Sequence, residues 1–153
     1  MPAPYTGGCL CGAVRYVLKG EPLTLYACHC TDCQRRTGTG FALSMVVSRS
    51  ELELQKGKPV HYAVKLEDGR TKTGLVCSAC NTRLWGEPVK VPDIAIIQPG
   101  TLDDTSWLRP VAHIWTRSAQ PWFQFPKGAV LFEQQPAPGE LRRLWQQRGS
   151  STR

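Results

Sequence analysis

The sequence lacks apolar runs long enough to cross a bilayer. Its longest ones, such as Phe41–Val47 and Ile94–Ile97, fall far short of the roughly 20 residues that a membrane-spanning helix needs. The first residues, MPAPYTGG, show no basic start followed by an apolar core, so no signal peptide is evident. We therefore expect a cytoplasmic protein without membrane association. Disulfides are rare in that compartment.

Blocks of basic residues and long helical patterns are also missing. Twelve prolines and fourteen glycines interrupt the chain, which argues against long helices. The net charge is +7, but the densest basic places are short, such as Arg35-Arg36 and Arg142-Arg143, and aromatic residues do not alternate with them. This pattern favours a basic surface that simply faces solvent. The more specific alternatives are that the positive charge attracts an anionic small molecule or nucleic acid. Nucleic-acid binding is the weaker of these expectations.

What the sequence does contain is a series of short β-type segments between turns, and it predicts a mainly β, mostly antiparallel fold with little helix. Asp68-Gly69 predicts a hairpin turn, since glycine readily takes a positive φ. The predicted strands are Ala13–Leu18, Leu23–Ala27, Phe41–Val47, Glu51–Leu54, Val60–Leu66, Thr71–Val76, Leu84–Trp85, Ile94–Ile97 and Val111–Trp115.

Two helical segments are expected. Thr31–Arg36 predicts one turn, with Thr31 or Asp32 as its N-cap. Gly139–Gln147 predicts a helix with an apolar face. The length suits one domain, and we expect residues 1–135 to form it and residues 136–153 to be an extension, as a short helix or a mobile tail.

The cysteines are the strongest chemical signal. There are seven, an odd number, so they cannot all pair within the chain. Their spacings are C-x-C, C-x-C-x-x-C and C-x-x-C, which are the tight loops that zinc knuckles use. Metal binding is therefore favoured over disulfides, and zinc over an iron–sulfur cluster, which these spacings do not call for.

The spacings allow two ways of dividing the sulfurs. In the first, Cys30/Cys33 and Cys77/Cys80 form an ordinary four-sulfur ribbon. In the second, Cys9/Cys11 and Cys77/Cys80 share one closed site, and Cys28, Cys30 and Cys33 form a three-sulfur site. Locality favours the second, because three sulfurs on a six-residue loop can meet one ion unaided. Four thiolates saturate a tetrahedral zinc, whereas three leave a position for water or substrate.

The three histidines carry weaker signals. His29 stands between two cysteines and could be a fourth ligand or a proton carrier, but adjacent residues of such a loop point in different directions, which favours a packing role. His61 is expected to be structural or exposed. His113, among apolar neighbours, is expected to be partly buried with a hydrogen-bond partner.

Several of these segments, in this order, resemble the glutathione-dependent formaldehyde-activating enzyme family, also called the GFA or centromere-protein-V domain. The resemblance runs from about Gly7 to Trp122, and all seven cysteines have counterparts. The segments that carry it are Gly8–Tyr16, Cys28–Gly38, Cys77–Leu84, Gly100–Asp104 and Pro110–Trp115. Where relatives commonly carry glycine after the last cysteine, this chain has Asn81, which also tolerates a left-handed backbone.

The resemblance implies a β-tent fold with two zinc ions per chain. It assigns Cys9, Cys11, Cys77 and Cys80 to a structural zinc, and Cys28, Cys30 and Cys33 to a catalytic zinc. The implied activity is that of a carbon–sulfur lyase, which condenses glutathione with formaldehyde to S-hydroxymethylglutathione. The implied partner is a small thiol.

Two arginines and two tryptophans are candidate contacts for a substrate. Arg35 and Arg36 could meet a substrate carboxylate, although for each one alone the pattern slightly favours a solvent-facing helix turn. Trp115 and Trp122 could wall a pocket, although aromatic residues in a β domain usually belong to the core. His29 and a zinc-bound water are both candidate acids for the new alkoxide. The alternatives are a zinc-stapled module that binds a protein or nucleic acid, and an enzyme of the same fold with an unrelated small-molecule substrate.

Overall fold

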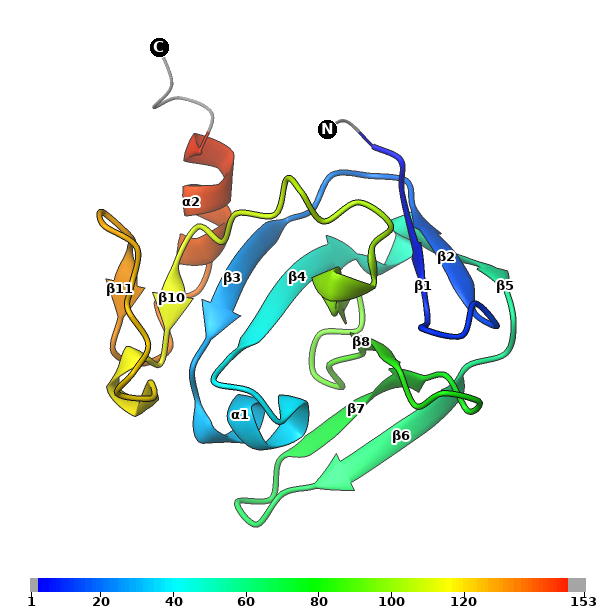
Figure 1. The fold of residues 1–153 in the computed structure, drawn as a ribbon, viewed down its shortest axis with the longest axis horizontal. Helices are drawn as coiled ribbons and strands as arrows, with labels where there is room; N and C mark the ends of the chain where they lie inside the picture. Colours follow the sequence, from blue (N-terminus) through cyan, green and yellow to red (C-terminus); the bar gives the residue numbers. More distant parts are fainter. Residues whose placement is uncertain (1–2, 149–153) are drawn as a thin grey trace. The chain divides into compact units, whose positions relative to one another are not determined.

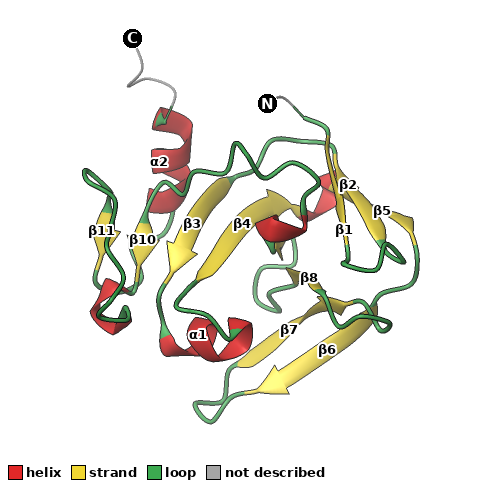
Figure 2. Ribbon diagram, in the orientation of Figure 1, coloured by secondary structure: helices red, strands yellow, loops and turns green. Residues whose placement is uncertain are grey.

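The computed structural model describes residues 3–148, and these divide into two compact units. The first unit comprises residues up to 22 together with 45–107, and the second comprises residues 23–44 and 108 onward. Strands and loops predominate in both (Figure 2), so the predicted mainly β fold with little helix is confirmed. Figure 1 labels most of these elements. No helix among residues 3–148 is long and apolar enough to span a membrane.

The first unit contains two antiparallel sheets. Three strands, β1 (Tyr5–Gly8), β2 (Arg15–Leu18) and β5 (Leu52–Lys56), pair in the order β1-β2-β5. The other sheet joins Met45–Ser48 of β4 (Ala42–Ser48) to β9 (Ile94–Ile97), β8 (Arg83–Gly86), β7 (Thr71–Val76) and β6 (Val60–Lys65) in that order. The strand β1 was not predicted from the sequence.

Local sequence explains these elements. Alternating burial along β4 and β9 places Met45, Val47 and Ile97 fully inside, as expected for a strand with one core face. The predicted turn between β6 and β7 is confirmed, with Gly69 at φ +85°. In β5 the predicted alternation is only half realised, because Leu52 is buried but Leu54, on the same edge strand, is 42% exposed.

The second unit is built around a short parallel arrangement. The strand β10 (His113–Ile114) pairs in parallel with both β3 (Thr24–Cys28) and β11 (Leu131–Phe132). These pairs are exceptions to the mostly antiparallel pattern, and β11 was not predicted. The helix α1 (Thr31–Thr37) follows β3. The helix α2 (Glu140–Gln147) contacts β3. Three 3-10 turns, Arg49–Glu51, Pro99–Thr101 and Thr116–Ser118, complete the structure of residues 3–148.

The helix predicted over Gly139–Gln147 is confirmed as α2. Its Trp145 is only 5% exposed, Leu141 packs against the buried cluster around Cys28, and the Leu141 carbonyl accepts a hydrogen bond of 2.9 Å from the Thr24 hydroxyl. This part of the predicted extension therefore packs on β3. The alternative of a mobile tail also covers residues 149–153, which lie outside the described residues.

Replacing Trp145 with alanine tests how far α2 belongs to the folded unit. Because the indole is buried, the variant should lose about 3–5 kcal/mol of unfolding free energy in denaturant titrations. Gln146→Ala, at the neighbouring exposed position, is the matched control and should change stability by less than about 0.5 kcal/mol. Equal stability of the two variants would show that α2 contributes nothing to the fold.

Candidate functional site

Four cysteine thiols of the first unit lie together and form what we call the four-sulfur group: Cys9, Cys11, Cys77 and Cys80. All are free, and their sulfurs lie within 4.8 Å of one another. The Cys9–Cys11 and Cys11–Cys77 sulfur separations are 3.5 and 3.8 Å. A disulfide would bring two sulfurs to about 2.05 Å. Tetrahedral zinc, with Zn–S bonds of about 2.3 Å, places its sulfurs about 3.8 Å apart.

Backbone turns bring each pair of these sulfurs onto one side of the chain. Around Cys9, the Gly12 N–H donates to the Cys9 carbonyl at 3.0 Å, with Gly12 at φ +76°. The Val14 N–H then donates to the Cys9 sulfur at 3.2 Å. Such N–H donation stabilises a thiolate, which is the form that binds metal.

The second turn, which carries Cys77 and Cys80, contains Asn81 at the position where relatives commonly have glycine. The Asn81 N–H donates to the Cys77 carbonyl at 2.8 Å, and Asn81 takes the left-handed conformation with φ 59°. The expectation that asparagine replaces the usual glycine conformationally is confirmed.

Thr82 is a contributor that motif reasoning missed. Its hydroxyl lies 3.1 Å from the Cys80 sulfur and accepts a hydrogen bond of 3.1 Å from the Leu10 N–H, so it links both knuckles. Hydrogen bonds from the Thr82 side chain and backbone lower the pKa of Cys80 to about 5. The signal in the sequence was only a hydroxyl residue two positions after a cysteine.

Three thiols of the second unit form the three-sulfur group: Cys28, Cys30 and Cys33. Cys28 ends β3, Cys30 caps α1, and Cys33 lies within that helix. Their sulfurs lie within 4.8 Å of one another. The predicted cap at Thr31 or Asp32 is wrong, because the Cys30 sulfur accepts the Cys33 N–H at 3.4 Å and takes that role.

Crowding makes ionisation of these thiols costly. The Cys30 and Cys33 thiols, followed by burial, raise the pKa of Cys28 strongly. For Cys33, the hydrogen bond with Cys28 lowers the pKa, but Cys30 and burial raise it by more, and the Arg36 charge offsets part of that increase. Three thiolates this close require a cation among them, as metal-ligating cysteines do.

The donor sets of both groups therefore suit metal ions, and zinc in particular. Free thiols, sulfur separations near those of a tetrahedral site and a crowded loop that resists ionisation without a cation all fit. The structure brings together the two sets of sulfurs that the favoured partition named. No histidine or carboxylate among residues 3–148 joins either set.

His29 does not point its ring into the sulfur group. Its Nε2 lies 3.0 Å from Nδ1 of His113, and the side chain is fully buried. Burial lowers the pKa of His29 to about 4 and also lowers that of His113, so both rings are neutral near pH 7. One ring donates and the other accepts in this bond. His113 is thus the buried, hydrogen-bonded residue expected, and His61 is exposed, also as expected.

Both the ring and the backbone of His29 make further contacts. Three phenylalanine rings surround the imidazole, with centroid distances of 5.2 Å to Phe41, 4.8 Å to Phe123 and 5.3 Å to Phe125. The His29 N–H donates to the Ile114 carbonyl, and its own carbonyl accepts from Nε2 of Gln34 at 2.9 Å. The residue between two cysteines is therefore fixed through both its backbone and its ring.

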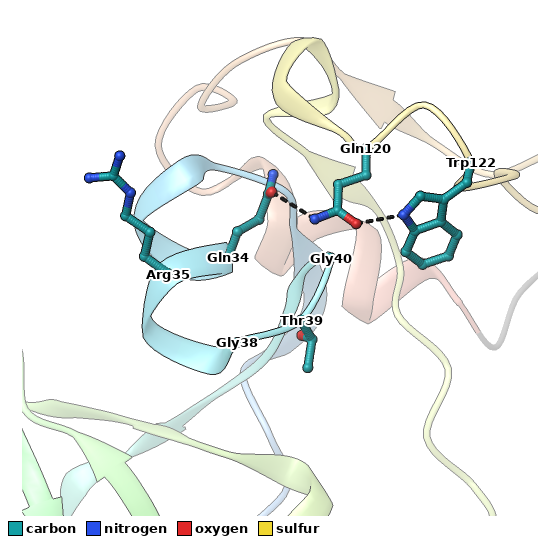
Figure 3. A pocket seen from close by; sticks show the side chains of 7 residues that line it. All are labelled: Gln34, Arg35, Gly38, Thr39, Gly40, Gln120 and Trp122. Carbon is teal, nitrogen blue, oxygen red and sulfur yellow. Dashed lines mark hydrogen bonds between the residues drawn. The ribbon is translucent and has the colours of Figure 1, made fainter.

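The expected substrate residues lie in different places. Arg35 lines a pocket of about 540 Å³, beside α1, to which Trp122 also contributes (Figure 3). Arg36 acts on Cys33 as described and does not line this pocket. Trp115 packs against the buried cluster that contains Cys28 and Cys33, with the Arg117 guanidinium 5.1 Å from its ring centroid.

His113→Ala should lower the free energy of unfolding by about 2–4 kcal/mol. The change removes the partner of His29 Nε2, and His29 Nδ1 already has none, so a fully buried ring would lose all hydrogen bonding. Denaturant titration measures the effect, with His61→Ala as the exposed control. A His113 variant as stable as the His61 variant would show that the pairing is energetically irrelevant.

Thr82→Val should weaken zinc retention by the four-sulfur group about 10- to 100-fold, because Cys80 loses its hydroxyl partner. Competition with a chelating dye measures this, in a Cys30→Ser background so that the three-sulfur group contributes little. The matched control is Thr71→Val, at an exposed β7 position. Identical zinc release from both variants would remove Thr82 from the support of this group.

Comparison with known proteins relates the fold and the family of this chain to others. One crystal structure, of a protein from Rhodobacter sphaeroides, is 19% identical, covers 83% of this chain and 98% of that chain, and superposes with a TM-score of 0.52. That likeness concerns the fold alone. The sequence profile of the glutathione-dependent formaldehyde-activating enzymes matches residues 4–118, about three quarters of the chain. With the fold and both cysteine groups in place, the chain belongs to the glutathione-dependent formaldehyde-activating enzyme family.

Proposed function

We propose that the protein is a zinc-dependent carbon–sulfur lyase that joins a small thiol, glutathione by family membership, to formaldehyde as S-hydroxymethylglutathione. The observation that carries the proposal is the three-sulfur group. Three free thiols lie together there, and no fourth ligand from residues 3–148 accompanies them. A site of this kind suits chemistry, whereas the four-sulfur group suits a structural staple.

The ligand assignment is part of the proposal. Cys9, Cys11, Cys77 and Cys80 would hold a structural zinc, and Cys28, Cys30 and Cys33 a catalytic one. The catalytic ion, when bound, would leave one position for the substrate sulfur and favour its thiolate, the nucleophilic form of a thiol. Three thiolates make it a weaker Lewis acid than zinc held by neutral histidines, which suits delivery of a sulfur better than activation of water.

The residues around the sulfurs orient the substrate. Arg36, whose charge acts on Cys33, and Arg35, in the pocket beside α1, are the proposed partners of substrate carboxylates. Trp115, packed against the sulfur-bearing cluster, would wall the site. His29 is held on every side by neighbours, which favours a role in fixing the Cys28–Cys30 segment over direct proton transfer to the substrate.

The reaction balances without a further reagent. The sulfur forms a bond to the formaldehyde carbon, the carbonyl π bond breaks, and the thiol proton ends on the new hydroxyl oxygen. No oxidant or reductant takes part. The work left to the chain is to hold the thiol and the aldehyde in attacking geometry, which accelerates a two-component addition substantially.

Exchange NMR of formaldehyde with glutathione tests the proposal. The zinc-loaded protein should raise the rate of adduct formation above the spontaneous rate. Equal rates with and without protein would rule out this activity for the chain.

A pair of cysteine variants separates the two proposed zinc roles. Cys30→Ser should keep the fold, judged by circular dichroism and denaturant titration, and lose the rate enhancement. Cys80→Ser should lower the unfolding free energy by about 2 kcal/mol or more, because the four-sulfur staple is lost. An unfolded Cys30 variant beside a stable Cys80 variant would reverse the assignment.

A further inference from the structure

The strand β6 is the last strand of its sheet. It pairs with β7 on one side, and no strand among residues 3–148 pairs with its other side (Figure 1). Five of its six residues are exposed. Natural proteins protect such open edges with proline or with charges inside the strand. Here Pro59 precedes the strand, and Lys65 at its end is its only lysine, arginine or acidic residue, so the middle of the edge is unprotected.

The backbone groups that face the open side can be identified from the turn between β6 and β7. The Leu66 N–H donates to the Arg70 carbonyl at 2.8 Å, which closes that turn. Bonded and non-bonded pairs alternate along an antiparallel ladder, so every second residue back from Leu66 bonds to β7. The residues between them turn their N–H and C=O groups outward. These are His61, Ala63 and Lys65, and within the described chain no hydrogen bond engages their outward groups.

One face of β6 carries an apolar stripe that is the same in both directions. Side chains alternate along a strand, so Val60, Tyr62 and Val64 share this face. The two valines are 45% and 51% exposed. The Tyr62 side chain leans over Gly74, its neighbour on β7, where an added Cβ would lie 2.7 Å from the hydroxyl. An antiparallel second copy of β6, with a two-fold axis at Tyr62 or at Ala63, would place apolar side chains opposite apolar ones.

Opposite charges lie at the two ends of the strand. Lys58 precedes β6 and Glu67 follows it, and both are exposed. Neither side chain forms a hydrogen bond or an ion pair within residues 3–148. Nine positions separate them, about 30 Å of extended chain, so they cannot pair within one molecule. In an antiparallel pair of β6 strands, Lys58 of each copy would lie near Glu67 of the other.

The charge of the first unit favours a second copy over a polyanion as the partner. Residues 1–22 and 45–107 contain ten lysines and arginines and nine acidic residues, a net charge of +1. The remaining +6 of the chain's +7 belongs to the second unit. A nearly neutral unit repels its own copy little, and it offers a nucleic acid little attraction.

We propose that β6 is a self-association surface, on which the β6 strand of a second copy of this chain pairs in antiparallel orientation. The outward backbone groups form a ladder between the chains, the apolar stripes contact each other, and Lys58 and Glu67 pair twice across the two-fold axis. Six residues a side are fewer than the roughly 20–30 of a standard interface. The dimer is therefore weak, with a Kd of about 10–100 µM.

Sedimentation equilibrium of the full chain tests the pairing. The parent mass should rise from one chain toward two as the concentration passes the Kd. Val64→Lys, which sets a charge in the apolar stripe of both copies, should raise the Kd at least about tenfold. The matched control is Val89→Lys, at a valine of the same unit that is 68% exposed, and it should associate like the parent.

Two results of this experiment would overturn the proposal. A parent that stays monomeric up to about 1 mM would leave the edge to an extended segment of a different protein. Equal association of the two lysine variants, with folding verified by circular dichroism, would place the contact elsewhere on the molecule.

A charge exchange tests the two-fold arrangement. Lys58→Glu should weaken the dimer about three- to tenfold, because two acidic side chains then meet at each end of the interface. Adding Glu67→Lys should restore the parent affinity. These positions are too far apart to pair within one chain, so the rescue requires contact between copies. A double variant that associates no better than Lys58→Glu alone would contradict this geometry.

Amide hydrogen exchange gives a residue-specific reading. The outward amides of Ala63 and Lys65 should exchange more slowly above the Kd than after dilution below it. The amides of Tyr62 and Val64, which bond to β7, should exchange equally slowly at both concentrations. Outward amides that exchange at the same rate at both concentrations would show that β6 is not the contact, whatever the mass of the protein.

Discussion

Repulsion between neighbouring sulfurs is the constraint on which the rest depends. Thiols held within 4.8 Å of one another cannot all ionise in a metal-free chain, and the strongly raised pKa of Cys28 expresses that cost. The fold nevertheless keeps them together, and hydrogen bonds to Cys9 and Cys80 ease the cost where the chain allows it. A cation would stabilise the ionised form of these thiols, and its binding would then be coupled to the native state.

Different kinds of contact hold the four-sulfur group and the three-sulfur group together. The four-sulfur group draws on two turns, and Thr82 ties them together through the Leu10 N–H and the Cys80 sulfur. The three-sulfur group takes all its sulfurs from one short segment, between the end of β3 and the first turn of α1, and relies on its neighbours for rigidity. Those neighbours are His113, Gln34 and the phenylalanines around His29. The sulfurs are thus held together by backbone turns in one case and by side-chain packing in the other.

Much of this was predictable because it is local in sequence. Strands such as β4, β7 and β9, the turn at Gly69 and the helix α2 follow from hydrophobic period and turn chemistry over a few residues. The two sets of clustered sulfurs were suggested by C-x-C and C-x-x-C spacings. Family resemblance supplied the names of fold and reaction, which spacing alone cannot give.

What escaped the sequence depends on contacts between distant segments. Nothing around His29 indicates that its ring meets His113, because parallel pairing of β3 with β10 creates that contact. The Cys30 cap was missed because hydroxyl and carboxylate residues, Thr31 and Asp32, are the usual caps, whereas here the sulfur is already turned inward. Trp122 was named only as a wall or a core residue, and the hydrogen bond that its Nε1 donates to Oε1 of Gln120 could not be read from the sequence.

The parallel pairing of β10 with β3 makes the support of the three-sulfur group depend on a strand far away in the sequence. Its three cysteines fall within six consecutive positions, yet Ala27 and Cys28 pair with His113 and Ile114, and residues 45–107 belong to another compact unit in between. The ribosome therefore delivers the thiols long before the strand that braces them. Closing so long a loop is entropically unfavourable until the later contacts form, so the packing that braces these neighbouring ligands depends on a histidine 84 positions further along the chain than His29.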